Sequence, residues 1–145
     1  MPSRFAEDVD LIASIPDRND RIQALISIAE RHQSPPHEVA VPPYPEEARV
    51  PACESEAFVF PVQRPDGTLD FHFAVLNPQG VSAMALSVML RDGLSGAPLD
   101  QVASVEDDVV YRIFGRELSM GKSMGLTAMV AMVRRAAQQA LNRSD

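Results

Sequence analysis

The spacing of apolar and polar residues changes several times along the chain, and each change predicts a different element. In residues 1–33 the apolar positions recur every three or four residues, which is typical of two amphipathic helices. The first helix ends before Pro16 and turns inward Phe5, Val9 and Ile12. Asp17, with Asp20 three residues later, caps the second helix, whose inward residues are Ile22, Leu25, Ile26 and Ala29.

Residues 34–51, SPPHEVAVPPYPEEARVP, contain six prolines. Proline fixes φ and removes a backbone donor, so this segment is predicted to be an extended, stiff connection. A linker between domains is one interpretation of it. We favour a loop that wraps over a single domain, because the 33 residues before it are too few to form a core.

In the next segment apolar residues recur at every second position, which predicts a β-hairpin with one apolar face. The first strand alternates Phe58, Phe60 and Val62, and after the turn RPDGT the second alternates Phe71, Phe73 and Val75. Asn77 and Pro78 then predict a cap and a first turn, opening a helix that stops near Gly93 and turns inward Val81, Ala85, Val88 and Met89.

Three more helices are predicted towards the end of the chain. A short one lies in APLDQVASV, and the next is capped by Ser104 and Asp107 and ends at Gly115. The last runs from about Lys122 to Leu141 and buries Leu126, Val130, Val133 and Ala137. The predicted fold class is α+β, with a small antiparallel sheet between about Val50 and Leu76 and helices packed on one face. The expected core comprises Phe58, Phe60, Phe71, Phe73, Val88, Leu126, Val130 and Val133.

The composition of the chain argues against several classes of binding partner. The chain has 145 residues and a net charge of −7, from 20 acidic and 13 basic residues. Nucleic acids and anionic membranes are disfavoured partners, because both need clustered Lys and Arg. We expect no transmembrane segment, since no apolar run reaches the ~18 residues needed, and no signal peptide. A single cysteine indicates the cytoplasm, and leaves a small molecule or another protein as partner.

Most of the sequence motifs that could indicate a chemical function are weak matches. GKS at residues 121–123 lacks the P-loop glycine at position 116, where Arg116 stands, and it follows a helical pattern. His32, His37 and His72 fit no metal-ligand spacing with Cys53. Cys53 itself stands between a proline-rich run and a strand, and its position alone leaves a functional thiol and a buried filler about equally open.

The residues around Cys53, VPACESEAFVF, resemble the cysteine signature of the SufE family of sulfur acceptors. The resemblance continues through LDFHFAVLNPQGVSAMALSVMLRDGLSGAPLDQV and into the closing helix, ELSMGKSMGLTAMVAMVRRAA. It implies a SufE/IscU-like fold and a single domain over 1–145. That domain comprises N-terminal helices in 1–33, a proline-rich loop in 34–52, an active-cysteine loop and hairpin in 53–76, and helices in 77–141.

The resemblance also implies a function. Cys53 would accept persulfide sulfur from a SufS-like cysteine desulfurase, stimulate that enzyme, and pass the sulfur to a SufBCD-like Fe-S scaffold. Arg49, Glu54, Ser55 and Lys122 are the implied supporting or partner-binding residues. No cofactor and no metal are expected here, because the pyridoxal phosphate belongs to the desulfurase. We expect Cys53 at the tip of a loop before a strand beginning near Ser55, with its thiol turned toward an apolar recess.

Three positions depart from the family pattern. Glu54 stands where Gln is frequent and adds negative charge beside the thiol. Lys122 replaces Arg, which keeps the charge and loses the bidentate fork. Asn77-Pro78-Gln79 replaces an Asp-Ser-Asp-like stretch.

Three other functions compete with sulfur transfer. The first is a non-catalytic regulator of a desulfurase, in which Cys53 is idle. The second is a thiol hydrolase, for which no histidine partner is assignable. The third is a cluster scaffold, which commonly needs three cysteines.

Overall fold

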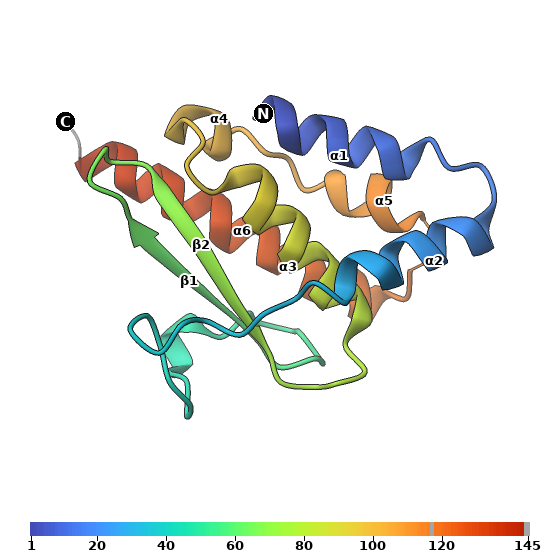
Figure 1. Ribbon diagram of the computed structural model, residues 1–145, viewed down its shortest axis with the longest axis horizontal. Coiled ribbons are helices and arrows are strands. Elements are labelled where there is room, and N and C mark those ends of the chain that lie inside the picture. The colour runs from blue at the N-terminus through green and yellow to red at the C-terminus, as the bar shows by residue number, and fades with distance from the viewer. Residues whose placement is uncertain (117, 144–145) are drawn as a thin grey trace.

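Helices cover one face of a two-stranded antiparallel hairpin (Figure 1), which confirms the predicted α+β class. The computed structural model describes residues 1–116 and 118–143. Its elements are α1 (Ser3–Ala13), α2 (Arg18–Ala29), the 3₁₀ turn η1 (Glu46–Ala48), β1 (Ala57–Gln63), β2 (Leu69–Val75), α3 (Val81–Leu94), α4 (Leu99–Ala103), α5 (Val109–Phe114) and α6 (Met120–Arg143). No helix among the described residues is long and apolar enough to cross a membrane.

The N-terminal helices join the same core as the rest of the chain. Helix α1 packs against α3 and α5, and α2 packs against α3. The predicted inward residues Phe5, Val9 and Ile12 are buried, and Asp17 caps α2 by accepting a 3.0 Å hydrogen bond from the Asp20 N–H. The prediction for α2 is wrong at Ile22, whose side chain stays 41% exposed.

The hairpin has two apolar faces, and the prediction of one is wrong. Phe60 pairs with His72 and Val59 with Phe73. Phe71 and Phe73 therefore face the helical core, whereas Phe58 and Phe60 lie on the opposite face. Alternation gives the faces of each strand alone, but the relative parity of two strands depends on the register that the turn sets.

The proline-rich segment covers the outer face of the hairpin. Tyr44 packs with its ring centroid 5.2 Å from that of Phe58 and 5.3 Å from that of Phe60. The Arg49 guanidinium lies 4.9 Å from the centroid of Phe58, a cation–π contact. Phe58 is consequently buried, while Phe60 is half-buried and is the one predicted core residue that is not fully enclosed.

Two predicted helix starts are also wrong. Asn77 does not cap α3, which begins at Val81. Instead, its Oδ1 accepts from the Gln79 N–H (2.9 Å), and its carbonyl accepts from the Gly80 N–H (2.9 Å). This local turn competes with the helix, as Asn side chains often do. Val81 is left 38% exposed rather than facing inward.

Helix α5 begins later than predicted and ends as predicted. Ser104 and Asp107 do not cap it: the Ser104 hydroxyl donates to the Gln101 carbonyl (2.8 Å), and the Asp107 carboxylate accepts from Arg134 (2.8 Å). Gly115 follows α5 with φ +84°, a left-handed conformation that favours glycine.

His32 ties the end of α2 to α3 through a neutral imidazole. The Ser87 hydroxyl donates its hydrogen to the Met84 carbonyl (2.7 Å) and lies 2.9 Å from His32 Nδ1. Nδ1 must therefore carry the N–H that Ser87 accepts. His32 Nε2 is buried without a hydrogen-bond partner among the described residues. Burial, and secondarily the charge of Arg91, lower the pKa of His32 below 6.5.

We predict that this histidine makes the fold sensitive to mild acid. Near pH 6.5 the unfolded chain takes up the proton before the folded chain does, so the free energy of unfolding should begin to fall as the pH drops through about 6.5. Urea unfolding above and below this pH checks it. His32→Gln should flatten the dependence, whereas the exposed control His37→Gln should leave it unchanged. An equal slope for wild type and His32→Gln would contradict the assignment.

Candidate functional site

The loop that carries Cys53 is closed by backbone hydrogen bonds on both sides. On one side the Val50 N–H donates to the Ala57 carbonyl (2.8 Å), and Arg49 forms an isolated bridge with Phe58. On the other side the carbonyls of Glu56 and Ser55 accept from Leu76 and Asn77 (both 3.1 Å). Strand β1 thus begins at Ala57 rather than near Ser55, and Cys53 lies at the end of the hairpin that is opposite the turn.

The backbone on both sides of Cys53 is in a left-handed conformation. Ala52 has φ 60° and Glu56 has φ 53°. This region costs a non-glycine residue about 1–2 kcal/mol. A 3.2 Å hydrogen bond from the Glu56 N–H to the Cys53 carbonyl closes the turn between them. The surrounding contacts must hold the loop in this shape, because its own residues do not favour it.

Those contacts come from glycines at the starts of two helices. A Cβ on Gly125 of α6 would lie 2.9 Å from Cys53 Cα and 3.0 Å from the Ala52 carbonyl oxygen. A Cβ on Gly80, just before α3, would lie 2.7 Å from Ser55 Oγ. The absence of side chains at these two positions lets the loop sit directly on the backbone of both helices.

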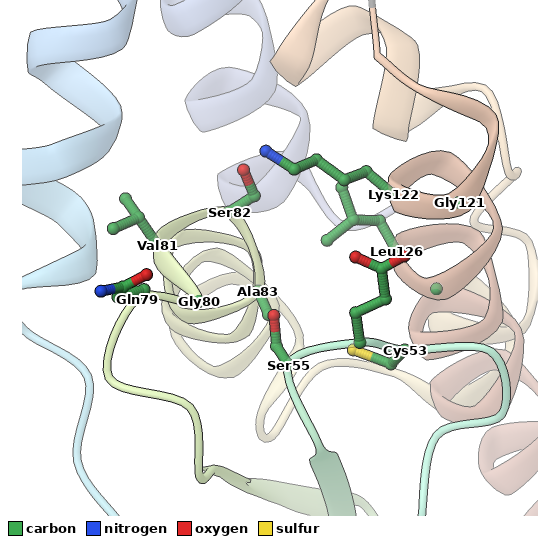
Figure 2. Close-up of a pocket in the computed structure, with 12 residues that line it drawn as sticks. Cys53, Ser55, Gln79, Gly80, Val81, Ser82, Ala83, Gly121, Lys122 and Leu126 are labelled. Atoms are coloured by element: carbon green, nitrogen blue, oxygen red, sulfur yellow. The ribbon is translucent and has the colours of Figure 1, made fainter.

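A small pocket of about 110 Å³ lies where the loop meets the helices. Figure 2 shows Cys53 and Ser55 on the loop, opposite residues from the beginnings of α3 and α6. The walls include the polar side chains of Gln79 and Ser82 as well as apolar ones, so the recess is mixed rather than apolar as predicted. Cys53 is half-buried. Its thiol is therefore sheltered without being sealed from solvent.

The pocket has opposing charges around it. The first turns of α3 and α6 carry the positive ends of their helix dipoles, and Lys122 adds an exposed cation. Glu54 opposes them and lies against the start of α6, since a Cβ on Gly121 would be 3.1 Å from its Oε1. The Lys122 side chain extends toward Ser82 and away from Cys53 in Figure 2. An anionic sulfur here would have the helix ends as its nearest positive charge.

The structure brings four of the five predicted site residues together. Cys53, Glu54, Ser55 and Lys122 all line the pocket. Arg49 does not line it, because its side chain pairs with Glu46 (3.1 Å) and stacks on Phe58 across the hairpin. Its contribution there is to hold the start of the loop.

Sequence reasoning missed the glycines and Gln79. Gly121 and Gly125, spaced by four residues in an otherwise regular helical pattern, were a usable signal of a close backbone approach. Among the described residues, no group of three or more His, Cys, Asp or Glu is placed to hold a metal ion.

We predict opposite effects of alanine at the two helical glycines. Either substitution gains about 1 kcal/mol of helix propensity. Gly125→Ala should nevertheless destabilise the protein by about 1–3 kcal/mol in urea unfolding, because its Cβ meets loop backbone. It should also change the rate at which iodoacetamide alkylates Cys53. In the matched control Gly121→Ala, the new Cβ meets only the end of the Glu54 side chain, which can move aside, so this variant should be more stable than the wild type. Equal stability of the two variants would show that the loop does not depend on this contact.

Comparison with known proteins places the chain in a family. The family described as SufE, Fe-S metabolism associated domain, matches residues 6–137. A solution structure described as that of a hypothetical protein from Thermus thermophilus superimposes with a TM-score of 0.75 and 26% sequence identity, covering 98% of both chains. No match is found among curated proteins. With nearly its whole length matched, the chain belongs to the SufE family of Fe-S metabolism associated domains.

Proposed function

We propose that this protein accepts sulfur from a SufS-like cysteine desulfurase as a persulfide on Cys53, stimulates that enzyme, and passes the sulfur on to a SufBCD-like Fe-S scaffold. The observation that supports it most is the position of the only cysteine. Cys53 lies on a strained loop, in a pocket at the starts of α3 and α6, in a member of a family associated with Fe-S metabolism.

Two exchange steps account for the proposed transfer. The Cys53 thiolate, its proton released to solvent, attacks the terminal sulfur of a persulfide on the donor cysteine. A new S–S bond forms on Cys53, the donor S–S bond breaks, and the donor leaves as a thiolate. A thiolate of the next acceptor then attacks the terminal sulfur on Cys53 in the same way. Sulfur changes carrier in each step, and no external oxidant or reductant is consumed.

A single cysteine suits this role. A second thiol beside a persulfide would attack its inner sulfur, release hydrosulfide and leave a disulfide. Cys53 is the only cysteine of the chain, so no internal thiol competes. A persulfide is readily anionic, and the positive ends of α3 and α6 favour that charge.

Delivery requires the loop to move, because Cys53 is half-buried. Ala52 and Glu56 hold left-handed conformations on either side of it. Rotating these residues to ordinary backbone angles releases unfavourable local energy, which offsets part of the free energy needed to separate the loop from Gly80 and Gly125. The loop is therefore built to be drawn out by a partner at a modest cost.

We predict that Cys53→Ser abolishes sulfur acceptance with little loss of stability, since serine is nearly isosteric and the site is partly open to solvent. Incubation of the wild type with a cysteine desulfurase and cysteine should add one sulfur atom to Cys53 by mass spectrometry. The variant should gain none and should melt close to the wild type. If Cys53→Ser still stimulates the desulfurase fully, the protein is a regulatory partner and Cys53 is idle.

A second prediction concerns the cation beside the pocket. Lys122→Glu should lower desulfurase stimulation about tenfold without unfolding the protein, because a negative charge replaces a positive one at the mouth of the pocket. Lys122→Arg, which keeps the charge, should retain stimulation. Stimulation assays with thermal melts of the three proteins check this. Unchanged stimulation by Lys122→Glu would remove Lys122 from the site.

A further inference from the structure

Two apolar residues that the helical pattern predicts to be buried are exposed. Ile22 on α2 is 41% exposed, and Val81 at the start of α3 is 38% exposed. Both line the same groove, of about 630 Å³, whose other walls come from α2, the end of α5 and residues 115–116 and 118–119. The described part of the chain does not cover Ile22 and Val81, so the groove stays open.

The groove has an apolar floor and a basic edge. Leu25, Phe114 and Leu118 form buried or half-buried parts of its lining. Arg116 and Lys122 are exposed on it, and neither makes an ion pair within the part of the chain that is described. In a chain with a net charge of −7, two cations without an ion-pair partner among the described residues, beside an uncovered apolar surface, indicate a binding surface for negative charge.

The groove adjoins the Cys53 pocket. Val81, Ser82 and Lys122 line both. A molecule that occupies the groove therefore contacts residues that also form the edge of the pocket. The groove has several times the volume of the pocket.

We propose that this groove docks an acidic segment of the protein that delivers sulfur to Cys53, with a large apolar side chain of that segment packed against Ile22 and Val81. The proposal rests on the proposed function, because it names the chemistry of the donor surface. Carboxylates of the segment pair with Arg116 and Lys122, and the apolar side chain covers the two exposed residues. A second copy of this chain is the competing occupant, which the oligomeric state tests.

Two groove variants with matched controls test this. Arg116→Glu reverses a groove charge, and Arg135→Glu reverses an exposed charge on α6 that does not line the groove. Ile22→Asp places a carboxylate in the groove. Its control, Leu11→Asp, places a carboxylate on α1 outside the groove, at a residue that is 67% exposed. Persulfide formation on Cys53 is followed by mass spectrometry against the concentration of each protein, with a purified cysteine desulfurase and cysteine as the source of sulfur.

Each groove variant should raise the half-saturating concentration about tenfold, and each control less than about twofold. The effect of Arg116→Glu should shrink at high salt, as for a charge pair at an interface edge. Loading of Cys53 by a small persulfide, such as glutathione persulfide, needs no docking and should be equal in the wild type and all the variants. Thermal melts should show that all of them are folded.

The outcomes separate the two proposals. A wild-type protein that forms no persulfide with the desulfurase overturns the proposed function and this inference with it. A wild type that is loaded, while Arg116→Glu and Ile22→Asp behave like their controls, overturns the groove alone. Sedimentation showing that the wild type dimerises and the groove variants do not would assign the groove to a second copy of the chain and overturn the acidic donor segment.

Discussion

The backbone contact between the Cys53 loop and α6 is the constraint on which the site depends. Cys53 Cα and the Ala52 carbonyl leave no room for a Cβ at Gly125, and Ser55 leaves none at Gly80. These contacts hold the left-handed residues on either side of the cysteine in place. The hairpin and the helices behind it bring together three segments that are far apart in the sequence. The pocket lies where these segments meet, through the loop backbone at Gly125 and through the Ser55 side chain at Gly80.

Local patterns predict the elements well where burial is one-sided. The apolar stripes of α1 and α6 are buried as their spacing indicates. The faces of the hairpin are predicted wrongly, because the register across residues 64–68 decides which side Phe58 shares with Phe71, and alternation does not contain that information. The cap at Asn77 fails because its side chain bonds to the Gln79 N–H in a turn of its own.

The site shows the same division between local and long-range information. The resemblance around Cys53 and Lys122 indicates the residues of the pocket, whereas their arrangement depends on contacts between residues 53, 80 and 125. The prediction includes Arg49 among the site residues because it lies close to Cys53 in the sequence. Arg49 instead forms an isolated bridge with Phe58, and its side chain lies over the Phe58 ring. Ile22 and Val81 are predicted to be buried but are exposed. The tertiary structure places both in one groove, which the helical pattern of either segment does not contain.

Shelter and delivery make opposite demands on a sulfur carrier, and under the proposed function this chain would meet them at two neighbouring places. Within the pocket, the closed loop and two helix ends favour a retained, anionic sulfur. Outside it, Ile22, Val81 and Arg116 offer contacts that the folded protein leaves unused. Lys122 lines both regions, and its flexible side chain suits a cation that serves either, where the planar fork of arginine would favour one fixed partner. Binding energy gained in the groove is then available to draw the strained loop away from Gly125. Under the proposed function, the loop would be drawn out to receive sulfur when the donor fills the groove, and would keep that sulfur sheltered once the donor has left.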